Sequence, residues 1–113
     1  MRVSYVLLGG EKRPVCFSLS AVEELEEEFG SLDAMREALV NGRVSAINRV
    51  LEIMLRAGHN YCEVMGLDHP APLKCRPSDL IDVSDIREGS VVTDIFAAMK
   101  SDTDRSVETT RKN

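Results

Sequence analysis

The sequence predicts a mainly α protein of the α+β class, with an N-terminal β-hairpin packed on a bundle of about four helices. Two observations predict this class. Over the first 19 residues apolar side chains recur at every second position, as in strands with one apolar face. Over residues 20–100 they recur at three- and four-residue spacing in several segments, as in amphipathic helices. We therefore expect one globular domain over residues 1–100 and a disordered polar tail over residues 101–113.

The hairpin is expected to consist of strands at residues 3–8 and 15–19. Their alternating apolar residues are Val3, Tyr5 and Leu7 in the first strand and Val15, Phe17 and Leu19 in the second. Residues 9–14 contain two glycines, a proline and three charged residues, which favour a hairpin loop. Because an isolated hairpin is only marginally stable in water, we expect it to pack on the helices that follow.

The first helix is expected to begin at Ser20 and to end at Gly30. Ser20 and Glu23 have the spacing of a capping box, and Gly30 suits a left-handed helix end. Its apolar positions are Val22, Leu25 and Phe29, and five glutamates fill positions 23, 24 and 26–28. We interpret this acidic block as a solvated helix face. The alternative is that it docks a basic partner.

Three further helices are expected. Ser31 caps a helix that continues to Val40, and a strongly apolar helix over residues 44–57 ends at Gly58. Three prolines exclude a long helix between residues 59 and 77, although residues 78–82 could form a single turn. The last helix is amphipathic and covers residues 90–100.

Composition argues against several classes of function. A formal charge of −5 and the presence of only five aromatic residues oppose nucleic-acid binding. No apolar run approaches the roughly 20 residues that a membrane-spanning helix needs. Cys16, Cys62 and Cys75 are odd in number and irregularly spaced, which favours a reducing cytoplasm over a secreted disulfide framework.

Residues capable of metal binding or nucleophilic catalysis gather in the proline-containing stretch. They are His59, Cys62, His69 and Cys75. Their spacing lacks the close ligand pairs of common structural zinc sites, and no nucleophile motif surrounds either cysteine. The sequence therefore predicts no metal site, no cofactor, no catalytic residue and no enzymatic activity.

Three segments occur in an informative order. They are FSLSAVEELEEEFG at residues 17–30, AINRVLEIMLRAG at 46–58 and DLIDVSDI at 79–86. Following a short hairpin and preceding a terminal amphipathic helix, they resemble the tail assembly chaperones of long-tailed bacteriophages, prophages and gene-transfer particles. The first segment resembles that family's acidic helix with its glycine end, the second its buried helix, and the third a short connecting segment.

The resemblance implies a non-enzymatic protein of the bacterial host cytoplasm. It would bind the tape-measure protein, keep it soluble and assist assembly of the tail-tube subunits. Self-association into a homo-oligomer stays open. The alternative function is a small helical regulator or adaptor that binds DNA or protein through the second and third helices, because the Asn41-Gly42 turn and three arginines there permit a helix-turn-helix.

The candidate client-binding residues lie on two helices. They are Val92, Ile95, Phe96 and Met99 on the apolar side of the last helix, and Met54 on the third helix. The methionines would suit an adaptable docking surface. A client helix could lie in such a groove. The alternative is that the last helix only completes the core, as amphipathic helices usually do.

Overall fold

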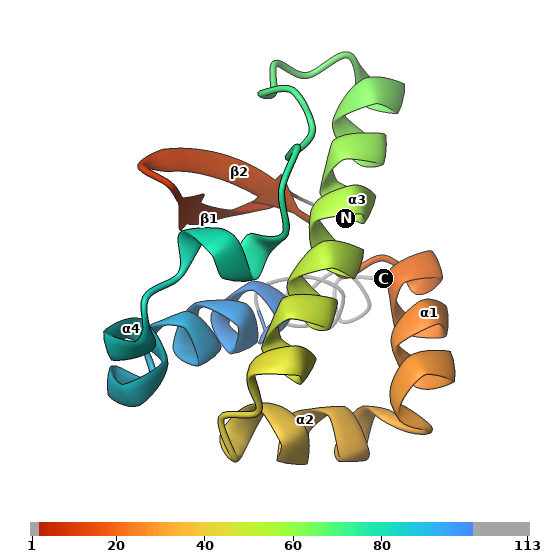
Figure 1. Cartoon of the computed structure of the whole chain (residues 1–113). Helices are drawn as coiled ribbons and strands as arrows, with labels where there is room; N and C mark the ends of the chain where they lie inside the picture. The colour runs from red at the N-terminus through yellow and green to blue at the C-terminus, as the bar shows by residue number, and fades with distance from the viewer. Residues whose placement is uncertain (1–2, 101–113) are drawn as a thin grey trace.

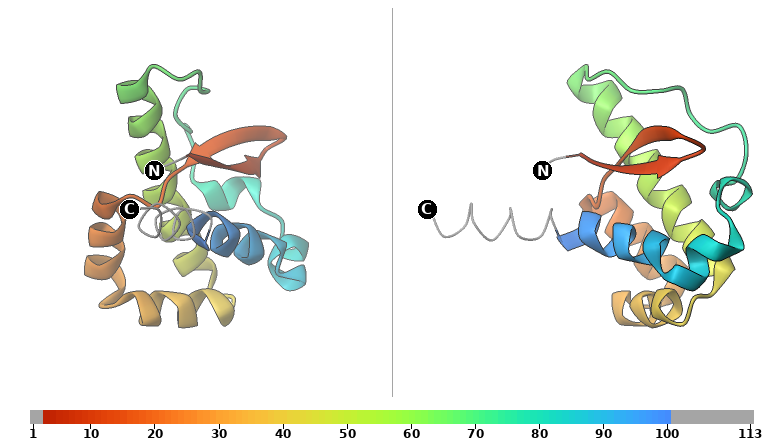
Figure 2. Two further views of the ribbon diagram at one scale, coloured as in Figure 1. Left: turned by 180° about the vertical axis from the view of Figure 1, so that it is seen from behind. Right: turned by 90° about the vertical axis from the view of Figure 1, so that its left-hand side faces the viewer.

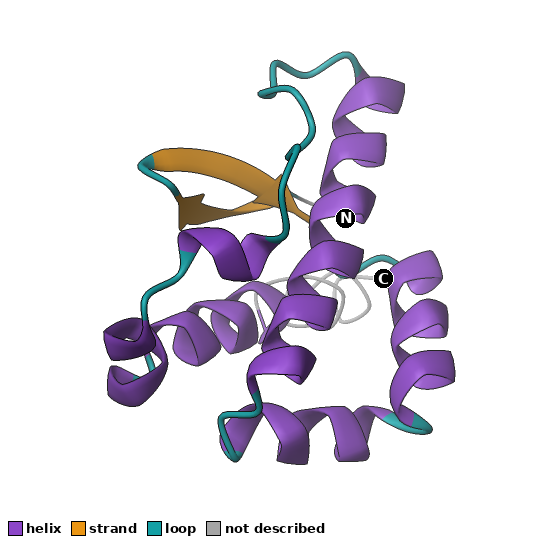
Figure 3. Cartoon of the chain, in the orientation of Figure 1, coloured by secondary structure: helices purple, strands orange, loops and turns teal. Residues whose placement is uncertain are grey.

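The computed structural model describes residues 3–100 and confirms the predicted fold class, with an N-terminal two-stranded hairpin followed by helices (Figures 1 and 3). The elements in order are β1 (Ser4–Leu8), β2 (Glu11–Val15), α1 (Leu19–Phe29), α2 (Leu32–Val40), α3 (Val44–Met65), the 3₁₀ turn η1 (Pro77–Leu80), α4 (Val83–Glu88) and a final helix over residues 90–100. The tail predicted over residues 101–113 lies outside the described residues.

The hairpin is tighter than the sequence predicted. β1 and β2 are antiparallel, and Leu8 pairs with Glu11 across a two-residue turn. Gly9 and Gly10 form this turn with φ values of 60° and 80°, which two-residue hairpin turns require and glycine adopts without strain. The second strand therefore runs over Glu11–Val15, and the predicted strand at residues 15–19 is wrong. Pro14 is tolerated because a two-stranded sheet has only edge strands.

The first helix begins earlier than predicted. Ser18, and not Ser20, is the N-cap residue: its Oγ accepts a hydrogen bond from the backbone N–H of Ala21 at 3.2 Å. Leu19 is therefore in the helix and exposed, instead of lying on a strand face. The end is as predicted, since Gly30 has a φ of 90° and its N–H donates to the carbonyl oxygen of Glu26.

The second helix is as expected, and the third is longer. Ser31 caps α2 by accepting from the N–H of Ala34 at 3.1 Å. α3 continues through Gly58 and ends at Met65, where Gly66 adopts the left-handed conformation. The prediction that Gly58 ends this helix is wrong, because β2 crosses the helix there. A Cβ atom on Gly58 would lie 2.5 Å from the carbonyl carbon of Pro14.

α3 lies at the centre of the hydrophobic core. The hairpin, α1, α2 and the final helix pack around it (Figure 2). Its largest fully buried side chains are Leu25, Met35, Leu39, Ile47, Leu51, Ile53, Met54 and Ile95. The chain leaving the hairpin is also fixed to α3 by its backbone, since the N–H of Cys16 donates to the carbonyl oxygen of Met54 at 3.1 Å. α3 is thus the central element of the fold.

After α3 the chain turns back along the molecule as a connecting strap, residues 67–76, which contains no regular helix or strand (Figure 1). The strap leads to η1, one residue earlier than the predicted turn at residues 78–82. There the backbone N–H of Ser78 donates to Oδ1 of Asn48, a buried polar side chain of α3, at 2.9 Å. α4 was not predicted because its six residues are too few to show a helical period.

The final helix covers the predicted residues 90–100. Ile95, Ala98 and Met99 are buried, and Val92 and Phe96 pack against the core while partly exposed. None of the helices within residues 3–100 combines the length and the apolar character needed to cross a membrane.

Candidate functional site

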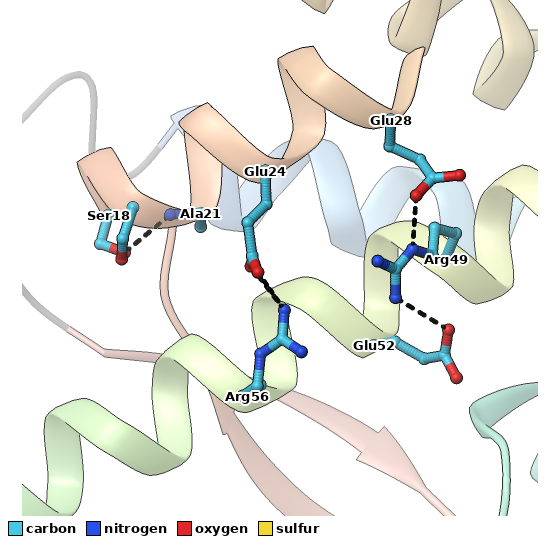
Figure 4. A network of polar contacts seen from close by, with 8 residues as sticks. Ser18, Ala21, Glu24, Glu28, Arg49, Glu52 and Arg56 are labelled. Atoms are coloured by element: carbon cyan, nitrogen blue, oxygen red, sulfur yellow. Dashed lines mark hydrogen bonds and ion pairs between the residues drawn. The ribbon is translucent and has the colours of Figure 1, made fainter.

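Two of the five glutamates in the acidic block of α1 pair with arginines of α3, and within residues 3–100 the other three do not. Glu24 and Glu28 face α3, where Glu24 binds Arg56 and Glu28 binds Arg49 (Figure 4). Nη2 of Arg56 lies 2.5 Å from both carboxylate oxygens of Glu24, and Nε of Arg49 lies 2.9 Å from Oε1 of Glu28. The other three glutamates, Glu23, Glu26 and Glu27, are exposed. Part of the block therefore joins two helices of its own chain.

Arg49 has a second carboxylate nearby. Its Nη1 lies 3.5 Å from Oε1 of Glu52, one turn further along α3. The hydrogen bond to Glu28 raises the pKa of Arg49, partial burial opposes the shift, and the charges of both glutamates add to it. The guanidinium groups of Arg49 and Arg56 are thus directed at α1 and neutralised there.

A recess of about 310 Å³ lies beside α3, between β2 and the connecting strap. Its apolar lining residues are Pro14, Leu55, Pro70, Ala71, Pro72, Leu73 and Pro77, and its remaining lining residues are Arg13, Glu52, Arg56, His59 and Cys75. This volume is at the lower end of the roughly 300–1,000 Å³ of typical ligand pockets. The recess can accept one or two apolar side chains of a partner, with charged groups at its margin.

Arg13 connects the hairpin to the strap at this recess. Its Nη1 donates to the carbonyl oxygen of Ala71 at 2.9 Å, and its Nη2 pairs with Glu11 at 2.9 Å. Nε of Arg13 is buried and has no hydrogen-bond partner within the described residues. Buried polar groups are nearly always hydrogen-bonded, so this N–H is an exception among the described residues.

The four residues capable of metal binding that are close in sequence do not assemble as one cluster; they are His59, Cys62, His69 and Cys75. The two histidine rings meet edge to face, with centroids 4.7 Å apart. Cys62 is fully buried, and this burial raises the pKa of its thiol. Cys75 is exposed and lines the recess.

The third member of the histidine cluster is instead a carboxylate, Glu63. Its Oε1 lies 3.5 Å from Nε2 of His59 and 3.3 Å from Nε2 of His69. His59 and Glu63 are four residues apart on α3, so they share a helix face. That spacing is visible in the sequence and is the signal by which this pair could be found.

The candidate client-binding residues are placed mainly inside the molecule. Ile95, Met99 and Met54 are buried in the core, while Val92 and Phe96 are partly exposed at its margin. A different set of apolar side chains is exposed where α3 meets the strap, namely Val64, Met65 and Leu67. The recess and this end of α3 are therefore more accessible to a partner than the apolar side of the final helix.

Comparison of the chain with protein-family models, with curated proteins and with solved structures found no match in any of the three.

Proposed function

We propose that this chain is a non-enzymatic tail assembly chaperone of a phage or prophage, which binds the tape-measure protein and assists tail-tube assembly in the cytoplasm of the bacterial host. The order of segments supports the proposal: a hairpin, an acidic helix ended by Gly30, a buried helix, a short turn and a terminal amphipathic helix follow one another. The observation that carries it is the apolar recess beside α3.

The recess suits a helical client for two physical reasons. Apolar surface lines it, so burying an apolar client side chain there removes both surfaces from water. The hydrogen bond from Arg13 to Ala71, which ties the strap to β2, is at an exposed site. Water competes for a hydrogen bond at an exposed site, so this bond offers little resistance to a shift of the strap that admits a client.

The second candidate function, a regulator or adaptor acting through α2 and α3, has less support. A DNA-recognition helix needs cationic side chains directed outward. Arg49 and Arg56 instead pair with α1, and the middle of α3 is buried under its neighbours. Docking through the buried middle of α3 would require α1 or the final helix to move away, so only exposed positions such as Val40 and Val44 are open to this function.

The binding test uses the full chain co-expressed with the tape-measure protein. The client is the product of the very long gene expected beside this one, next to a tail-tube gene. Leu73→Asp places a charge in the recess, while Val40→Asp places one on an exposed position of α2 outside the recess. We expect Leu73→Asp to reduce co-purification at least about tenfold, which corresponds to 1.4 kcal/mol, and Val40→Asp to leave it unchanged.

Circular dichroism on both variants separates loss of binding from loss of folding. A folded Leu73→Asp variant that still co-purifies as the unchanged chain does would overturn the recess as the client site. Failure of the unchanged chain to retain the tape-measure protein, or the absence of tube and tape-measure genes beside its own, would overturn the chaperone function itself.

A further inference from the structure

We propose that His59, Glu63 and His69 form a binding site for a divalent transition-metal ion such as Zn²⁺. The proposal is independent of the chaperone function. Each of the three residues offers one donor atom, and these atoms lie within 4.8 Å of one another. Nε2 of each histidine lies within 3.5 Å of Oε1 of Glu63. Two imidazoles and one carboxylate are ligand types that Zn²⁺ and its first-row neighbours accept.

The separations fit a metal at the centre of the cluster. Ligand atoms about 2.1 Å from a zinc ion at tetrahedral angles lie about 3.4 Å from one another. Oε1 of Glu63 lies 3.5 Å from Nε2 of His59 and 3.3 Å from Nε2 of His69. Two of the three distances between ligand atoms are thus already near the value that tetrahedral coordination requires.

The hydrogen bond on the far side of His69 fixes which nitrogen can bind the ion. Nδ1 of His69 lies 2.8 Å from the carbonyl oxygen of Leu67, and a carbonyl can only accept. Nδ1 therefore carries the proton, and in the neutral ring Nε2 has the lone pair. Metal-binding histidines are oriented in this way by a backbone carbonyl or a carboxylate.

In this tautomer a cation between His69 and Glu63 would be stabilising. A lone pair on Nε2 of His69 faces a carboxylate oxygen of Glu63, and two acceptors at 3.3 Å repel unless a positive charge lies between them. A proton or a metal ion can supply that charge. The two histidine side chains are mostly covered, whereas Glu63 is 61% exposed, so an ion can enter from the solvent side and keep water as a further ligand.

The site would join two parts of the chain. His59 and Glu63 belong to α3, whereas His69 lies on the connecting strap. His59 also lines the recess. A bound ion would hold the strap against α3 beside the recess. Metal binding should therefore stabilise the folded chain in proportion to the logarithm of the free ion concentration.

The test is titration of the full chain with Co²⁺ and with Zn²⁺, followed by visible absorption and calorimetry. The chain has two histidines in total, so imidazole binding can come only from this pair. We expect one ion per chain, cobalt bands of a nitrogen and oxygen site, and a higher melting temperature with Zn²⁺. Glu63→Gln and His69→Gln should each weaken binding at least about tenfold.

Cys75→Ser is the matched control, because it removes an exposed metal-capable group that lies outside the cluster. It should bind as the unchanged chain does. The proposal is overturned if the folded chain binds neither ion, or if His69→Gln binds as tightly as the unchanged chain. A sulfur-to-cobalt charge-transfer band that disappears in Cys75→Ser would also overturn it, since the ligands would then be cysteines.

Discussion

The backbone of Pro14 in β2 lies directly against Gly58 in α3. A Cβ atom on Gly58 would lie 2.5 Å from the carbonyl carbon of Pro14 and 2.7 Å from the Cα of Val15. Backbone atoms cannot turn aside as a flexible side chain can. We therefore expect Gly58→Ala to force the hairpin away from α3 and to lower the free energy of unfolding by about 1–3 kcal/mol, measured by urea denaturation.

A gain in stability of Gly58→Ala would contradict this prediction. In a helix interior without such a contact, replacing glycine with alanine stabilises by about 1 kcal/mol. A gain of that size in Gly58→Ala would show that the hairpin does not lie on α3 as described.

Asn48 should contribute to stability through one hydrogen bond. Its Oδ1 accepts from the N–H of Ser78, and the side chain is 4% exposed. Asn48→Ala leaves that N–H without its partner, so we expect a loss of about 1–3 kcal/mol in thermal or urea unfolding. Asn60→Ala, at an exposed position of the same helix, is the control and should change stability by less than about 0.5 kcal/mol. Equal effects of the two substitutions would contradict the assignment.

The ion pair between Glu24 and Arg56 should contribute little to the free energy of unfolding. Both side chains are about half exposed, and water screens their attraction. A double-mutant cycle with Glu24→Gln and Arg56→Gln should give a coupling energy of about 0.2–1 kcal/mol at low salt. It should fall further in about 1 M NaCl. A coupling that salt leaves unchanged would mean that the pair acts through packing.

Phe96 should act as a core residue. It packs against the buried cluster from the final helix, so Phe96→Asp places a charge at the margin of the core. We expect the free energy of unfolding to fall by about 2–4 kcal/mol. Ala97→Asp, at the exposed neighbour, should stay within about 0.5 kcal/mol of the unchanged chain. Retained stability in Phe96→Asp with loss of tape-measure binding would instead assign this helix face to the client.

Helices whose apolar residues recur at regular helical spacing could be predicted from the sequence. α2 and the final helix occur where apolar spacing and Ser31 or Ser90 placed them. The wrong predictions concern residue types that can serve two structural roles. A glycine can end a helix or admit a neighbouring backbone, and Gly58 does the second because β2, from much earlier in the sequence, crosses it. A local pattern contains no information about that crossing.

The candidate sites were harder to predict than the fold. The recess depends on where the strap lies against α3, and the strap has no period that fixes its path. The histidine cluster required Gly66 to reverse the chain so that His69 returns to Glu63. Closeness in sequence groups the histidines with cysteines, whereas in the structure Cys62 is on the buried side of the helix.

The crossing of β2 over α3 also has a consequence for the order of folding. The hairpin leaves the ribosome before α3 does, but its second strand packs on that helix, which ends at Met65. A lone hairpin is marginal in water, and closing the intervening loop costs entropy before the contact forms. We expect the hairpin to become protected from hydrogen exchange only after α3 is complete, so an element made early is among the last to become stable.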